Sequence, residues 1–121
     1  MKKLPDAELE VMQAIWACTS PVTRQDIDQI LKDTHPMAVT TLLTLLTRLS
    51  EKEFIQIEKV NRNSRYIPLV SQAEYLANQS KTFIQKLCGG NLNVFASALC
   101  DSGLSNEDIE ELRDLLERKE L

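Results

Sequence analysis

Two segments of the chain carry side chains that could hold a polyanion. Residues 40–49 read TTLLTLLTRL. In a helix, which turns by about 100° per residue, Thr40, Thr44 and Thr47 share one face. Short hydroxyls can approach phosphates and base edges closely, and a threonine methyl can pack on a thymine methyl. Residues 59–65 place three cations among amides and a hydroxyl, and such cations supply most of the sequence-independent affinity for nucleic acid.

Each segment alone has a plainer interpretation. Threonines are tolerated on a surface helix, and a charged hairpin is often only a solvated turn. A solvated helix face would more commonly carry Glu, Lys or Gln, however, and this face has almost no acid. We favour DNA binding because the two segments occur in the order that one DNA-binding fold requires. The residues predicted to contact DNA are Thr40, Thr41, Leu43, Thr44, Thr47, Arg48, Lys59, Arg62, Asn63 and Arg65.

Leu43 does not fit this polar face. It lies among the threonines, so its side chain either meets a thymine methyl group or indicates that the helix is rotated slightly from this assignment. Both interpretations are open at the level of sequence.

Hydrophobic spacing predicts three helices ahead of a hairpin. The first covers residues 6–18, and a capping box from Thr23 to Asp26, with Asp in place of the preferred Glu, opens a second helix that ends near residue 33. The third covers about residues 37–51. The apolar residues of the three stripes are Leu9, Met12, Ile15, Trp16, Ile27, Ile30, Leu31, Val39, Leu42, Leu45, Leu46 and Leu49.

Alternating residues then predict two strands. They lie within residues 54–60 and 65–70 and are joined by a polar turn at 61–64, with Pro68 at a sheet edge or near a strand end. Three helices followed by a hairpin within about seventy residues is the winged helix-turn-helix arrangement, in which the third helix enters the major groove and the wing contacts the backbone. The predicted fold class is therefore mainly α with an N-terminal winged helix.

Three further helices are predicted after the hairpin. A long one covers residues 71–88 and stops at Gly89-Gly90, a short one covers 91–100, and the last, IEELRDLLERKE, follows a capping box at residues 105–108. The chain of 121 residues has 5% aromatic residues, which favours a helical domain with an appendage over a β-sandwich.

Charge is divided unevenly along the chain. Residues 1–70 hold nine basic and nine acidic residues, whereas residues 71–121 hold five and nine and so carry the whole net charge of −4. The competing interpretation is a winged-helix module that binds protein and has lost DNA binding. It would gain support if acids neutralised the wing and the third helix. The acids in question are Asp26, Asp28, Glu51 and Glu58.

Catalytic and metal chemistry find little support in the composition. The chain has one histidine, His35, and cysteines at 18, 88 and 100 without a CxxC or CxC pair. No nucleophile, base and orienting group can be assembled, so we expect no enzyme, metal or cofactor. Unpaired cysteines and the lack of a signal peptide or membrane span predict a cytoplasmic protein that does not contact a membrane.

Five stretches together resemble one family of repressors. They are AELEVMQAIW (7–16), TTLLTLLTRLSEKEFI (40–55), RYIPLV (65–70), SKTFIQKLCGG (80–90) and LSNEDIEELRDLLE (104–117). In this order they closely resemble the BlaI/MecI/CopY family of penicillinase and copper-homeostasis repressors. The resemblance implies a homodimeric repressor of transcription with one winged helix on each half of a palindromic operator.

The resemblance also implies a division of labour. Residues 1–70 would bind double-stranded operator DNA, and residues 71–121 would form a helical dimerisation region. In the alternative, Leu112, Leu115 and Leu116 fold back on the chain's own core. The residues expected to form the dimer are Phe83, Leu87, Phe95, Leu99, Ile109, Leu112, Leu115 and Leu116.

Two mechanisms of the family lack their residues in this chain. The resemblance implies that antibiotic-responsive members are inactivated by proteolysis at an Asn-Phe bond. In this chain the residues that correspond to that bond lie within SALC (97–100), and the nearest asparagine, Asn93, is followed by Val94. Copper-responsive members carry two CxC elements near the C-terminus, whereas no cysteine follows Cys100. Copper sensing by that site is excluded, and an upstream sensor or protease stays unidentified.

Overall fold

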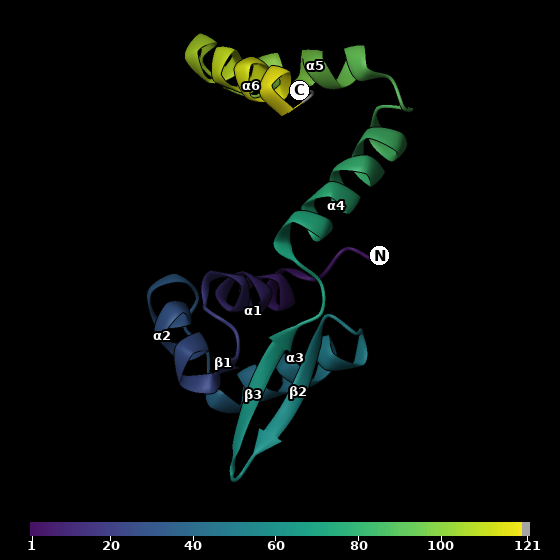
Figure 1. Cartoon of the computed structure of the whole chain (residues 1–121). Helices are drawn as coiled ribbons and strands as arrows, with labels where there is room; N and C mark the ends of the chain where they lie inside the picture. The colour runs from purple at the N-terminus through teal and green to yellow at the C-terminus, as the bar shows by residue number, and fades with distance from the viewer. Residues whose placement is uncertain (120–121) are drawn as a thin grey trace. The chain divides into compact units, whose positions relative to one another are not determined.

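The computed structural model describes residues 1–119, which form helices and short strands (Figure 1). The chain divides into two compact units, Met1–Gln79 and Ser80–Leu121, and the division falls inside α4. In chain order the elements are α1 (Asp6–Ala17), β1 (Val22–Thr23), α2 (Arg24–Thr34), α3 (Val39–Glu51), β2 (Ile55–Val60), β3 (Asn63–Pro68), α4 (Gln72–Leu87), α5 (Leu92–Asp101) and α6 (Asn106–Lys119).

The first unit is built on one apolar core. Helix α1 packs against α2 and α3, and all three helices contribute buried side chains that meet Phe54, Ile55 and Tyr66 from the hairpin region. The spacing of the leucines explains why α3 packs on the core with one face. Its buried positions recur every three or four residues and therefore lie on the same side of the helix. The buried residues of α3 are Leu42, Leu45, Leu46 and Leu49.

Several positions of the predicted stripes need correction. Val39 is 46% exposed, because it begins α3 and the core-facing stripe starts one turn later at Leu42. Leu9, Trp16 and Ile30 are only partly buried beside the core. Glu8, in contrast, is buried at 3% exposure although it is an acid, since its Oε1 accepts a hydrogen bond of 2.6 Å from Nζ of Lys52.

The sheet has three strands where two were predicted. Its order is β1-β3-β2, all antiparallel, and the additional strand β1 pairs Val22 with Tyr66 and Thr23 with Arg65. The predicted four-residue turn is shorter, because β3 begins at Asn63 and Asn61 adopts a φ of 60°. Asparagine tolerates this left-handed conformation better than most residues, which permits a tight connection. Pro68 ends β3, as predicted.

Tyr75 anchors the start of α4 within the first unit. Its hydroxyl accepts a hydrogen bond of 2.8 Å from the backbone N–H of Leu4, and its ring lies 5.8 Å from that of Trp16 and 5.7 Å from that of Phe54. The indole N–H of Trp16 donates to the carbonyl of Val70 at 2.9 Å. The hydroxyl of Tyr75 and the indole N–H of Trp16 therefore each have a hydrogen-bond partner. Together with the ring contacts, these bonds hold the segment after the hairpin to α1.

The second unit contains little buried apolar surface. Phe83 and Phe95 make an edge-to-face pair with ring centroids 6.0 Å apart. The predicted capping box of the last helix is present, since Ser105 and Asp108 exchange backbone-to-side-chain hydrogen bonds, and α6 begins at Asn106 rather than at Ile109. The predicted end of this helix at Glu120 lies outside the described residues. None of the described helices is long and apolar enough to cross a membrane.

Candidate nucleic-acid interface

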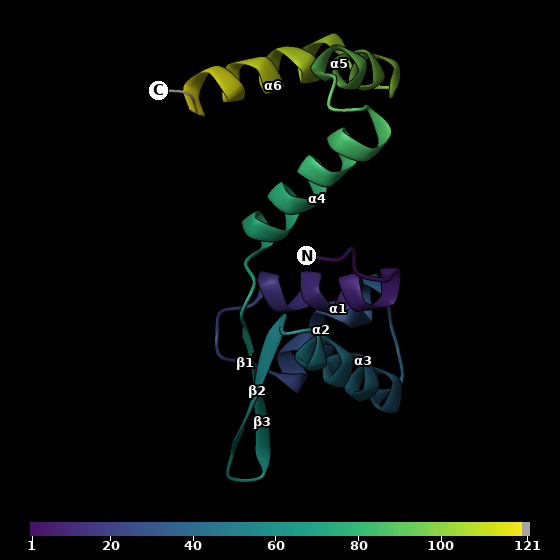
Figure 2. The ribbon, with the colours of Figure 1, turned by 90° about the vertical axis from the view of Figure 1, so that its right-hand side faces the viewer.

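A groove opens between the N-terminus of α2, the exposed face of α3 and the hairpin of β2 and β3. Its volume is about 370 Å³. In both views of the ribbon the hairpin tip extends beyond the helices α1, α2 and α3, so its turn is accessible to a large partner (Figures 1 and 2). The groove is lined by Thr23, Arg24, Gln25, Leu43, Val60, Asn61, Arg62, Asn63, Ser64, Arg65 and Tyr66.

Four residues predicted from the sequence therefore meet in one groove. They are Leu43, Arg62, Asn63 and Arg65. Lys59 is exposed on β2 beside them, and the remaining predicted residues lie on the solvent-facing side of α3. Those exposed residues of α3 are Thr40, Thr41, Thr44, Thr47 and Arg48.

The exposure of α3 argues against the second interpretation of Leu43, that of a rotated helix. The four leucines on the opposite face are at most 6% exposed, whereas Leu43 is 44% exposed. A helix rotated enough to bury Leu43 would expose part of that core. Leu43 is therefore an apolar side chain presented to the groove, next to polar and cationic neighbours.

Two threonine hydroxyls on this face already have hydrogen-bond acceptors. Thr44 donates to the carbonyl of Thr40 and Thr47 donates to the carbonyl of Leu43, each at 3.0 Å. A hydroxyl has a single proton to donate, so neither can donate to a phosphate without breaking its bond to the helix backbone. What Thr44 and Thr47 offer a partner in this state is an acceptor oxygen and a methyl group.

The hairpin presents cations with little compensation. Among the described residues, none of the ion pairs engages Lys59, Arg62 or Arg65. Glu58 lies directly across the sheet from Arg65, so it offsets part of that charge, whereas Arg62 occupies the exposed turn. The Arg62 cation therefore faces solvent without an ion-pair partner among the described residues.

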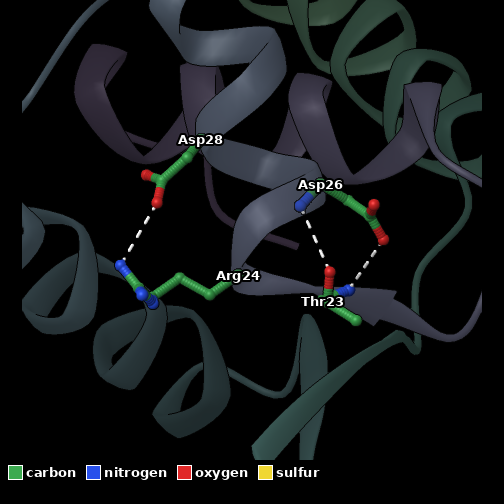
Figure 3. A network of polar contacts seen from close by, with 4 residues as sticks. All are labelled: Thr23, Arg24, Asp26 and Asp28. Carbon is green, nitrogen blue, oxygen red and sulfur yellow. Dashed lines mark hydrogen bonds and ion pairs between the residues drawn. The ribbon is translucent and has the colours of Figure 1, made fainter.

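Arg24 and Gln25 line the groove but were not predicted from the sequence. Thr23 and Asp26 form a reciprocal capping box, with hydrogen bonds of 3.1 and 3.2 Å, which starts α2 at the groove (Figure 3). Nη1 of Arg24 lies 3.2 Å from Oδ2 of Asp28, so one acid offsets its charge. The capping box itself is the sequence signal that places Arg24 at a helix N-terminus, where backbone N–H groups favour anions.

The Cys18 thiol lies within electrostatic reach of Asp26, which caps α2 beside the groove. Burial, and to a lesser extent the charge of Asp26, raise the pKa of the Cys18 thiol, so the thiol is kept protonated. A nucleophilic cysteine needs the opposite shift. Within residues 1–119 no three His, Cys, Asp or Glu side chains are grouped so that they could hold a metal ion.

The fold and the groove together define a class of protein. The described residues form three helices and a hairpin wing with exposed cations, and the exposed face of α3 carries threonines with one acid, Glu51, at its end. These are the parts of a winged-helix DNA-binding repressor. A family model described as penicillinase repressor matches residues 4–118. The chain belongs to the penicillinase repressor family, which confirms the resemblance to BlaI and MecI.

Individual relatives are similar over most of their length. The penicillinase repressor of Bacillus licheniformis is 36% identical over 121 residues, covering 97% of this chain and 94% of that protein. The methicillin resistance regulatory protein MecI of Staphylococcus aureus strain N315 is 35% identical over 120 residues, covering 97% and 95%. The solution structure of monomeric Bacillus licheniformis BlaI in complex with the blaP half-operator has a TM-score of 0.50 and 31% identity, covering 61% of this chain and 89% of that chain. These likenesses confirm the winged-helix fold.

Proposed function

We propose that this chain is a homodimeric repressor that binds a palindromic operator, with α3 in the major groove and the β2–β3 hairpin on the DNA backbone. The observation that carries the proposal is the groove that joins α3, the N-terminus of α2 and the hairpin, because it gathers Arg24, Arg62 and Arg65 beside a helix face whose one acid, Glu51, lies at the far end of α3. A similar solved structure is that of BlaI in complex with a half-operator, which supports operator DNA as the partner of this chain.

Two sets of contacts divide the work at the DNA. Arg62, Arg65, Lys59 and Asn63 hold phosphates, which fixes the orientation of the unit and supplies affinity without sequence preference. The exposed face of α3 reads base edges, and Arg48 at its end is long enough to reach a guanine. The residues of α3 assigned to the major groove are Thr40, Thr41, Leu43, Thr44, Thr47 and Arg48.

The second region supplies the dimer. We assign DNA binding to residues 1–70 and dimerisation to 71–121, because apolar side chains of the later helices remain uncovered within one chain. Leu87 is 72% exposed, Leu116 59% and Phe83 45%. Phe95, Leu99, Ile109 and Leu112 are partly covered, and Leu115 is 48% exposed. A second copy would bury this surface and place two winged helices on two symmetric half-sites.

No catalytic role is proposed, and the site of action is the cytoplasm. Cys18, Cys88 and Cys100 are all free thiols, which suits a reducing compartment where DNA is accessible. The chain represses transcription by occupying its operator, so it needs no cofactor for that step.

Selection of bound DNA from a random pool tests the proposal. We expect a recovered palindrome, followed by a fluorescence anisotropy titration in which log Kd depends steeply on log salt concentration. Recovery of no preferred sequence, together with a flat salt response, would contradict the proposal and favour a winged-helix module that binds protein instead.

Two variants separate the contacts. Arg62→Ala should weaken binding to all sequences about equally and reduce the salt slope by about 1, whereas Thr44→Ala should change the preferred sequence. Lys81→Ala, which removes an exposed cation from the second unit, is the matched control and should leave the slope unchanged.

A further inference from the structure

We propose that Leu43 reads a thymine methyl group, so that each half of the operator contains a thymine selected by an apolar contact rather than by a hydrogen bond. This inference rests on the proposed function, because it requires α3 to lie in the major groove. It concerns what α3 recognises there.

The first step is the position of Leu43. It is the apolar residue that α3 contributes to the groove, and the groove's polar lining includes Arg24, Arg62 and Arg65. Leu43 is 44% exposed, while its neighbour Leu42 is fully buried, so its exposure does not serve the core. An exposed leucine that shares a groove with three arginines is poorly suited to a protein partner's apolar core, but it is compatible with a DNA surface, which is anionic at its phosphates and apolar at thymine methyls.

The second step is the chemistry of the residues beside Leu43. The hydroxyl protons of Thr44 and Thr47 are donated to backbone carbonyls at 3.0 Å, so these residues present methyl groups and acceptor oxygens rather than donors. Val39, one helical turn before Leu43, is 46% exposed and adds two more methyl groups. One side of α3 is therefore rich in methyl groups that have no partner within the unit.

The third step is the match with a base pair. In the major groove thymine alone carries a C5 methyl group, and it is recognised by apolar contact. The other features of base edges are donors and acceptors, which a leucine cannot pair with and would leave desolvated. A groove with cations for the phosphates and Leu43 for the base edge therefore selects thymine at the contacted position.

Uracil substitution tests this contact directly. Using the full chain and an operator recovered from the random pool, each thymine is replaced in turn by deoxyuridine, which removes only the methyl group. We expect the substitution to weaken binding about fourfold at one position per half-site. This factor corresponds to the transfer free energy of one buried group of methyl size. The variant Leu43→Ala should bind the unsubstituted operator less tightly and should be insensitive to uracil at that same position.

The controls distinguish the possible failures. Leu69→Ala shortens another exposed leucine of the first unit and should keep the full sensitivity to uracil. If uracil has no effect at any position, or if Leu43→Ala keeps the same loss at every position, the inference about Leu43 is wrong. If Leu43→Ala changes self-association and leaves DNA affinity unchanged, a second copy of the chain covers Leu43 and the inference is also wrong. If no DNA sequence is selected at all, the proposed function itself fails.

Discussion

The two units of this chain differ most in what they bury. In the first unit, side chains from three helices and the hairpin region form one core. Among residues 80–119, Cys88 is the one apolar side chain that is buried, and Leu87, Leu92 and Leu116 are each more than half exposed. Burial of apolar surface is the main favourable contribution to folding, so the first unit has its own source of stability, whereas residues 80–119 bury little apolar surface within one chain.

The largest expected effect concerns the core of the first unit. Leu46→Ala should lower the free energy of unfolding by about 2–5 kcal/mol, because it removes a fully buried side chain and leaves a cavity. Urea denaturation followed by circular dichroism measures this loss. A loss within experimental error would mean that the first unit does not depend on its own core, and the contrast between the units would disappear.

The matching change in the second unit should affect association instead. Leu116→Ala removes an apolar side chain that is 59% exposed in one chain, so the first unit should unfold as before. Burial of a leucine contributes about 1.5–3 kcal/mol, so the dimer should dissociate at a concentration at least tenfold higher. Sedimentation over a range of concentrations measures this shift. An unchanged dimer would show that Leu116 folds onto its own chain or lies outside the interface.

The ion pair between Glu8 and Lys52 should give an intermediate effect within the first unit. Lys52→Met leaves the Glu8 carboxylate, which is 3% exposed, without its 2.6 Å donor. Hydrogen bonds to charged groups contribute about 1.5–3 kcal/mol. The side chain of Lys52 is 42% exposed, so solvent screens the pair, and we expect the free energy of unfolding to fall by an amount near the lower end of that range. Thermal unfolding checks this value. Adding Glu8→Gln should recover much of the loss, because it removes the unpaired charge.

The smallest expected effect compares the capping boxes of the two units. Thr23→Ala removes the cap of α2 and should lower the free energy of unfolding by about 1 kcal/mol. Ser105→Ala removes the equivalent cap of α6. If α6 belongs to the proposed dimer, the effect should appear in the dimer dissociation constant. Equal effects of both variants on unfolding alone would contradict the division between the units.

Local signals in the sequence predicted most of the fold. The capping boxes at Thr23 and Ser105 depend on residues three apart, and the buried leucines of α3 follow the helical period, so neither depends on distant contacts. Strand β1 was missed because two residues show no alternation, and Val22–Thr23 becomes a strand only by pairing with β3. The burial of Glu8 depends on Lys52, which is 44 positions later and outside the range of any local pattern.

The groove was predicted less completely than the fold. The cations of the hairpin and the face of α3 could be identified by type and spacing. Arg62, Asn63 and Arg65 do line one groove with Leu43, whereas Lys59 and the threonines of α3 are not among its lining residues. Arg24 was missed because its place in the groove follows from the packing of α2 beside the hairpin, which a helix pattern does not specify. The contacts to DNA and the residues of the dimer remain predictions, since each depends on a second molecule.

The cations that face solvent near the groove are few. They belong mainly to the hairpin, and residues 71–121 hold nine acids against five basic residues. Attachment to bulk DNA grows with the number of phosphates that a protein neutralises, and a chromosome offers about 10⁶–10⁹ competing sites. We therefore expect bulk DNA to hold this protein less strongly than it would hold a repressor with more exposed cations. At the same cellular concentration, the share of molecules free to occupy the operator should be correspondingly larger.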